Sequence, residues 1–265
     1  KDEAEAQTEA MDRLTQDLKL QNWGVKTLLY VIPSGEVYFV PWGALGVPSP
    51  IVVLPSGSWL NRMPKAVASA KAASVLGDPE TGGVLPNLPG AREEAKIVGE
   101  VYGVRPFLGE KATEEALRSD MGNGVGVLHL ATHGFFDDKN PLESAVILST
   151  GQRPFRLTAA RLFENPLPAT LVVLSACETG LGKAVAGDDF LGLARSFYLG
   201  GTQALVYSLW PVSDSPTQLF MEEFHRHAVP GGYGKAWQRA RDLLKGKGYS
   251  PSEYGAFILG GHAKS

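Results

Sequence analysis

Residues 171–180 read LVVLSACETG, an apolar run that leads into the single cysteine of the chain. Residues 127–134 read VLHLATHG and follow the same plan, with an apolar run that leads into His-Gly. Continuous apolar runs of this length are typical of strands buried on both faces, as the strands of a parallel sheet are. The two segments therefore predict a central sheet with a histidine and a cysteine at the ends of two of its strands.

The rest of the chain from residue 73 onward alternates between strand-like and helix-like segments. We predict strands at 74–76, 126–132, 145–148, 170–175, 203–209 and 256–259. We predict helices at 91–102, 113–119, 158–163, 188–199, 215–227 and 235–245. This alternation predicts an α/β protein, a three-layer α/β/α sandwich in which helices cover both faces of a mostly parallel sheet.

The N-terminal part follows a different pattern. Residues 1–23 are predicted to form an amphipathic helix, with Met11, Leu14 and Leu18 at helical spacing. This helix either packs on the main domain, residues 24–265, or is the last helix of an upstream region.

Two further segments precede the alternating region. Residues 27–32 and 36–40 are rich in β-forming residues and flank a Pro-Ser-Gly turn, which predicts a hairpin. Residues 41–58 are rich in proline and glycine and are predicted to wind over a surface.

Composition excludes several classes of function. The 265 residues include 25 Lys and Arg against 28 Asp and Glu, so no basic field favours nucleic acid. No apolar run approaches the ~20 residues of a membrane span and no apolar leader opens the sequence. We therefore expect a cytoplasmic protein that contacts neither nucleic acid nor membrane.

The single cysteine, Cys177, restricts the chemistry further. It cannot form an intramolecular disulfide or a cysteine-rich metal site, and we expect no metal and no cofactor. Cys177 is either inert packing or a reactive thiol.

His133 and Cys177 stand at the carboxyl ends of their predicted strands, where reactive groups of parallel sheets gather. If the two strands are neighbours, the pair is an activatable nucleophile and its acid–base partner. His129, mid-strand, is predicted to be a satisfied core histidine. The backbone N–H groups of Gly134 and Cys177 are the candidate oxyanion donors. Gly134 is a glycine either because substrate approaches the backbone closely or because the chain makes a tight turn there.

Three motifs carry a family resemblance: HLATHG at 129–134, LSACETG at 174–180 and SLWPVSD at 208–214. They resemble the signatures of the CHAT family of caspase-like cysteine peptidases, which is related to separase. Weaker matches at 88–94, 141–145 and 192–197 extend the resemblance over residues 27–260.

The resemblance implies a caspase-type fold, a catalytic dyad of His133 and Cys177, and peptide-bond hydrolysis without a metal in the chemical step. It also implies a protein substrate and control by a partner or by fused tetratricopeptide repeats, although no such repeats are visible in this sequence. Some relatives of this kind act in bacterial defence or cell-death signalling.

Three more residues are candidates for substrate binding. Asp214 matches the acidic residue with which separase-like enzymes hold a basic side chain, but Asp-Ser-Pro-Thr at 214–217 is equally typical of a helix N-cap. Asp189, with Asp188 before it, has the same two interpretations. Trp210 either walls the crevice or packs in the core.

The sequence thus predicts a cysteine endopeptidase that cleaves a specific protein target. The alternatives are a catalytically silent docking module with the same fold, and a thiol hydrolase or acyltransferase acting on a small amide. The glycine-rich segment 180–187 is predicted to rearrange on activation. His225 and His227 are predicted to be solvated, because residues two apart on a helix point to different faces.

Overall fold

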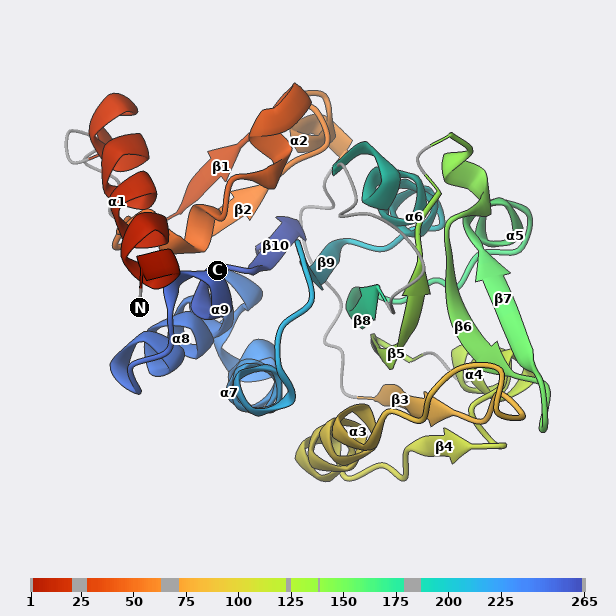
Figure 1. Cartoon of the computed structure of the whole chain (residues 1–265). Helices are drawn as coiled ribbons and strands as arrows, with labels where there is room; N and C mark the ends of the chain where they lie inside the picture. Colours follow the sequence, from red (N-terminus) through yellow and green to blue (C-terminus); the bar gives the residue numbers. More distant parts are fainter. Residues whose placement is uncertain are drawn as a thin grey trace.

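One mixed sheet of ten strands lies at the centre of the part of the chain that the structure describes (Figure 1). The structure is a computed structural model that describes residues 2–20, 28–62, 72–122, 125–137, 139–178 and 187–263. Within these ranges, side chains are described except at residues 1–8, 36, 39, 62, 177, 178, 187–191 and 229–231.

The strands are β1 (Leu29–Val31), β2 (Ile51–Val53), β3 (Ala73–Pro79), β4 (Phe107–Gly109), β5 (Val127–Phe135), β6 (Ala145–Ser149), β7 (Pro154–Thr158), β8 (Leu171–Glu178), β9 (Ala204–Ser208) and β10 (Phe257–Gly261). Their order in the sheet is β1-β2-β10-β9-β8-β5-β3-β4, and β6 and β7 extend from the end of β5. Neighbours along the main path are parallel except β9 and β10, which are antiparallel. The sheet is therefore mostly parallel, as predicted.

The helices are α1 (Asp2–Asp17), α2 (Trp59–Arg62), α3 (Pro89–Tyr102), α4 (Glu114–Gly122), α5 (Ala159–Glu164), α6 (Gly187–Leu199), α7 (Asp214–Gly231), α8 (Tyr233–Gly246) and α9 (Pro251–Tyr254). Helices α3, α7 and α8 cover one face of the sheet, and α5 and α6 lie on the other (Figure 1). This arrangement confirms the three-layer α/β/α sandwich. Among the described helices, none combines the length and the apolar character that crossing a membrane would require.

The central strands are buried on both faces. The apolar residues at the start of β5 and β8, such as Leu128 and Val172, are fully buried. Burial of a side chain of this size stabilises the folded protein by about 1.5–3 kcal/mol. These two strands thus form the rigid centre on which their last residues are placed.

Helix α3 packs directly on β3 because Gly77 has no side chain. A Cβ atom at Gly77 would lie 2.5 Å from the Cβ of Ala95 in α3. The helix begins with Pro89 at its first turn and ends at Gly103, whose φ of +66° suits a left-handed C-cap. The close contact fixes the start of α3 near the carboxyl end of β3.

Two predictions for the N-terminal region are wrong. Residues 35–39 form a 3₁₀ helix, η2 (Gly35–Phe39), so the predicted hairpin does not exist. Instead β1 pairs in parallel with β2, which lies in the segment expected to wind over a surface. That segment also holds the 3₁₀ helix η3 (Trp42–Ala44), and the side chains of Trp42 and Leu45 are buried. Apolar residues between the prolines decide its burial, whereas the proline content indicated a loop.

Helix α1 lies within the predicted helix 1–23 but ends at Asp17, six residues before the predicted end. Its Met11 and Leu14, together with Leu18 just beyond it, are half-buried against the hydrophobic core. The domain boundary after residue 23 stays a prediction, because residues 21–27 lie outside the described ranges.

Candidate active site

His133 and Cys177 are brought together by the pairing of β5 and β8. The strands are parallel neighbours, and in their register His133 is the partner of Cys177 and Gly134 the partner of Glu178. Paired residues of neighbouring strands lie about 5 Å apart. The backbone therefore has the arrangement that the sequence required, while the side chain of Cys177 is not among those described.

The His133 ring is held in one orientation by a backbone carbonyl. Its side chain is buried, and Nε2 lies 2.7 Å from the carbonyl oxygen of Pro86. Since a carbonyl only accepts, Nε2 carries the proton and donates it. In the neutral ring, Nδ1 is then the unprotonated nitrogen. Nδ1 is buried and has no hydrogen-bond partner among the described residues.

The protonation of His133 reflects opposing influences. Burial lowers the pKa of His133 below its usual value, because the protonated ring loses hydration. The hydrogen bond to Pro86 and the negative charge of Asp78 act in the opposite direction. The net result is a histidine that is held neutral near physiological pH but is stabilised by a nearby anion when it takes a proton.

Gly134 lies within β5 and not in a turn, so the tight-turn interpretation is wrong. It pairs with Val146 of β6 on one side and with β8 on the other. A Cβ atom there would lie 3.0 Å from the ring of Phe136 and 3.2 Å from the carbonyl oxygen of Ala176. A glycine fits here because a Cβ atom would force the Phe136 ring or the Ala176 carbonyl to shift by a few tenths of an ångström.

Asp214 lies in the first turn of α7 and is exposed to solvent. The N-cap is Ser213, so the alternative in which Asp214 caps the helix is off by one residue. A Cβ atom on Gly90 would lie 2.1 Å from Cγ of Asp214, so this carboxyl group rests against the start of α3. Because α3 follows the loop that contains Pro86, Asp214 lies near the element that holds His133.

Trp210 lies farther along the same edge of the sheet. Its indole N–H donates to the carbonyl oxygen of Ser252 at 2.8 Å. It lines a shallow pocket of about 330 Å³ together with Met11, Pro41, Pro251 and Ser252. Asp189 lies in the first turn of α6, which begins at Gly187. The side chain of Asp189 and the whole of residues 179–186, in which the predicted rearrangement falls, lie outside the described part of the chain.

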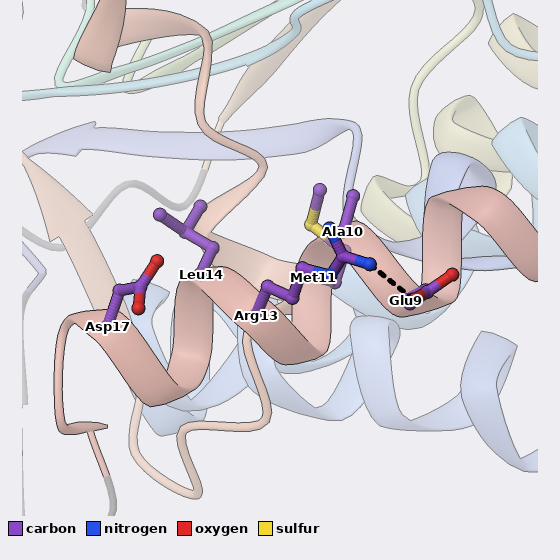
Figure 2. Close-up of a pocket in the computed structure, with 6 residues that line it drawn as sticks. All are labelled: Glu9, Ala10, Met11, Arg13, Leu14 and Asp17. Atoms are coloured by element: carbon purple, nitrogen blue, oxygen red, sulfur yellow. Dashed lines mark hydrogen bonds and ion pairs between the residues drawn. The ribbon is translucent and has the colours of Figure 1, made fainter.

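A second shallow hollow lies on helix α1 (Figure 2). It is lined by Glu9, Ala10, Met11, Arg13, Leu14 and Asp17. Within it, Nη2 of Arg13 donates to Oε1 of Glu9 at 2.5 Å, an exposed pair. A single helix supplies all of these residues. In the described part of the chain, no three His, Cys, Asp or Glu side chains converge on a metal position.

A buried chain of polar side chains, which joins α3 and α7 to β5 and β8, was not predicted from the sequence. The hydroxyl of Tyr102 lies 3.0 Å from Nδ1 of His225, and Nε2 of His225 lies 3.1 Å from Nδ1 of His129. Nε2 of His129 lies 3.0 Å from Oε1 of Glu94, close enough for an ion pair but without hydrogen-bond alignment. Ser175 donates to Oε2 of Glu94 at 3.0 Å. His129 is therefore a partnered core histidine, as predicted.

The prediction that His225 is solvated is wrong. Its side chain is only 1% exposed, because α7 is packed between α3 and α8. Burial lowers the pKa of His225 well below its usual value, and the neighbouring His129 lowers it further. His227 is half-buried and contacts Glu223 at 3.3 Å. Residues two apart on a helix do point to different faces, but α7 has neighbours on both of these faces.

The fold, with a histidine and a cysteine paired at the ends of adjacent parallel strands, defines a class: the caspase-like cysteine peptidase fold. The sequence matches the CHAT domain over residues 5–260. The chain therefore belongs to the CHAT domain family.

Two curated relatives are longer proteins. The chain is 28% identical over 284 residues to human tetratricopeptide repeat protein 28, and 26% identical over 293 residues to its mouse counterpart. In both, 87% of this chain is covered, which corresponds to 11% of the human and 12% of the mouse protein. The chain thus spans about a ninth of the length of these relatives.

Two solved structures share the fold. The Arg-specific cysteine proteinase gingipain R superposes with a TM-score of 0.59 at 11% identity, covering 97% of this chain and 67% of that one. Separase from the Saccharomyces cerevisiae separase–securin complex superposes with a TM-score of 0.57 at 16% identity, covering 90% of this chain and 15% of that one. At these identities the likeness concerns the fold alone.

Proposed function

We propose that this chain is a cysteine endopeptidase that cleaves a peptide bond in a protein target with a dyad of His133 and Cys177. The observation that carries the proposal is the register of β5 and β8, which pairs the two residues. In a parallel ladder, paired residues project to the same face of the sheet. The register therefore supports a shared face for the two residues, and Nδ1 of His133 is buried without a hydrogen-bond partner among the described residues.

Cys177 is the nucleophile of this reaction, and His133 is its acid and its base. Nδ1 of His133 takes the proton of the Cys177 thiol, the thiolate attacks the carbonyl carbon, and the carbon–sulfur bond forms. His133, protonated at Nδ1, gives that proton to the amine as the carbon–nitrogen bond breaks. Water then attacks the thioester with His133 as base, which releases the acid and restores the thiol. The Pro86 carbonyl keeps Nε2 protonated throughout, so that Nδ1 alone exchanges protons.

The oxyanion of the tetrahedral intermediate needs hydrogen-bond donors about 3 Å away. We assign this role to the backbone N–H groups of Gly134 and Cys177. Loss of one such donor typically lowers the rate at least about a hundredfold. Gly134 is a candidate because a glycine carries no side chain of its own that would cover its N–H group.

We further propose that Asp214 favours substrates with Arg or Lys before the scissile bond. Its residue is exposed and its carboxyl group rests against Gly90, beside the loop that holds His133. A carboxylate in this position offers a charge-assisted contact to a basic side chain. The roles of Trp210 as a wall of the substrate groove and of Asp189 in substrate binding stay predictions.

The proposal is tested by cleavage assays on candidate partner proteins and on a peptide library. Cleavage is expected to vanish in Cys177→Ala and in His133→Ala and to persist in the control His227→Ala, a histidine at the surface of α7. Cleavage that survives in Cys177→Ala would refute a cysteine peptidase. Asp214→Asn is expected to reduce cleavage after Arg about tenfold or more. An unchanged preference would remove Asp214 from the proposal.

A docking module that keeps the fold without catalysis is the second candidate. The observation that favours it is that the curated relatives are tetratricopeptide repeat proteins, a class named for repeats and not for catalysis. These relatives also support control of this chain by a repeat module or another protein partner. We further propose a cytoplasmic location. A partner that binds wild type and Cys177→Ala equally, with no cleavage of it and no reaction of Cys177 with thiol reagents, would favour the docking module.

A further inference from the structure

Asp78 has an unusual position at the end of β3. It is a buried carboxylate, only 4% exposed, in the sequence Gly77-Asp78-Pro79. The register between β3 and β4 shifts between Gly77 and Pro79, and the φ of Asp78 is +46°. Few residues other than glycine adopt this left-handed conformation, although Asp and Asn do so more readily than most. Such conformations persist where the surroundings enforce them, and they cluster at functional sites.

Each oxygen of the Asp78 carboxylate accepts one hydrogen bond. Oδ1 accepts the backbone N–H of Leu88 at 2.6 Å, and Oδ2 accepts Nε–H of Arg92 at 2.7 Å. Leu88 ends the loop between β3 and α3, and Arg92 lies in the first turns of α3. Asp78 thus ties the C-terminal side of this loop to the end of the strand.

Pro86 lies inside the same loop, between two sets of hydrogen bonds that hold the loop on either side of it. On its N-terminal side, the Thr81 hydroxyl accepts the N–H of Leu85 at 3.1 Å and donates to the Leu85 carbonyl at 3.0 Å. On its C-terminal side, Asp78 holds Leu88. The carbonyl of Pro86 is therefore fixed in position, and this is the carbonyl that accepts Nε2–H of His133.

We propose that Asp78 is a positioning residue of the dyad, which holds the Pro86 carbonyl against His133 and places a negative charge beside the ring. This inference rests on the proposed function of His133 and Cys177. In a Ser-His-Asp triad one carboxylate both orients the histidine and stabilises its protonated form. Here a neutral carbonyl orients the ring, and a carboxylate one step away supplies the charge.

The sign of the electrostatic effect depends on all charges around the pair. Among the described side chains, the other charged groups close to the pair in sequence or in the fold are Arg92 on α3, Glu80 in the loop and Asp214 on α7. Cys177 and Glu178 follow on β8, and their side chains lie outside the described part of the chain. Arg92 partly neutralises Asp78 and its side chain is 41% exposed. Removing the negative charge of Asp78 must make protonation of His133 harder. Removing the positive charge of Arg92 must make it easier.

Two variants with opposite expected effects therefore test the proposal. Asp78→Asn keeps the size and the tolerance for a positive φ but removes the charge, and Arg92→Gln removes its counterion. The control is Glu93→Gln, which changes the adjacent exposed residue of α3. The full chain is titrated by NMR at the His133 ring, whose signal is assigned through its absence in His133→Ala. Alkylation of the single cysteine by iodoacetamide is followed over the same pH range.

In Asp78→Asn we expect the titration midpoint of His133 to fall by roughly half a unit or more, and the alkylation rate near pH 7 to fall about threefold. In Arg92→Gln we expect the midpoint to rise. Midpoints that match wild type, or that move in the same direction in both variants, would overturn the proposal. A merely structural role would loosen the loop in both variants and could not reverse the sign.

These readouts do not require peptidase activity, so the two claims fail separately. Opposite shifts without cleavage of any substrate would leave Asp78 as the positioning residue of a non-proteolytic thiol site. Cleavage that depends on Cys177 together with an unshifted His133 would support the peptidase and remove Asp78 from it.

Discussion

His133 shows at the level of one residue how the backbone sets chemistry. The Pro86 carbonyl fixes which ring nitrogen carries the proton, and burial lowers the pKa of the ring, which favours its neutral form. The glycine that follows has an equally local reason, because the carbonyl of Ala176 lies 3.2 Å from where its Cβ would be. That carbonyl directly precedes Cys177.

Gly134→Ala is therefore expected to cost about 1–2 kcal/mol of unfolding free energy, because Phe136 and the Ala176 carbonyl must both shift. The same shift is expected to slow alkylation of Cys177 several-fold. Urea unfolding and iodoacetamide kinetics measure the two effects. Gly246→Ala is the control, since no atom lies within 4 Å of its added Cβ. If Gly134→Ala were as stable and as reactive as wild type, close packing would not be the reason for this glycine.

At the level of elements, the buried polar chain connects β5 and β8 to two helices, α3 and α7. Glu94 on α3 contacts His129 on β5 and accepts from Ser175 on β8, and His225 on α7 contacts His129. Breaking one member of such a network leaves buried polar atoms unpaired. The chain therefore fixes α3 and α7 relative to the strands, and with them the Pro86 loop and Asp214 at the starts of these helices.

The buried polar chain makes the free energy of unfolding of the protein depend on pH. The pKa of His225 is lowered in the folded protein because of burial and His129. Below about pH 6.5, the usual value for histidine, the unfolded state therefore binds more protons than the folded state. The free energy of unfolding is expected to fall as pH drops from 7 toward 5, by up to about 1.4 kcal/mol per pH unit for this histidine. His133 contributes in the same direction.

Urea unfolding at several pH values between 5 and 7.5 measures this dependence. His225→Phe is expected to be less stable at pH 7 but to show a shallower loss on acidification. His227→Gln, a change on the same helix at a half-buried position, is expected to keep the slope of wild type. Equal slopes in wild type and His225→Phe would mean that another group causes the acid sensitivity.

For the whole molecule, the sequence predicts the regular elements well and the connections poorly. The strands that form β3, β5, β6, β8, β9 and β10 and seven of the described helices, α1 and α3 to α8, follow from apolar runs and helical periodicity. β1 lies within residues 27–32, which were predicted as a strand but with the wrong partner, whereas β2, β4 and β7 were not predicted. β2 and β4 have only three residues, too few for any periodicity, and their pairing depends on partners distant in sequence. His225 was misjudged because the burial of α7 on two sides is a tertiary property.

The candidate site follows the same division. His133 and Cys177 were predictable because each ends a buried strand, and the register confirms the placement of their backbones. Asp78 was marked only by Gly-Asp-Pro after a predicted strand, and Pro86 by nothing in the sequence, because its role depends on a loop conformation. Glu94 acts through contacts across three elements.

The most direct test of the dyad is a crystal structure of the chain in which the distance between Sγ of Cys177 and Nδ1 of His133 is measured. We predict a distance below about 4 Å, with Nε2 of His133 still bonded to the Pro86 carbonyl. A sulfur sealed in the core away from the ring, or a ring turned so that Nε2 faces the sulfur, would contradict the account.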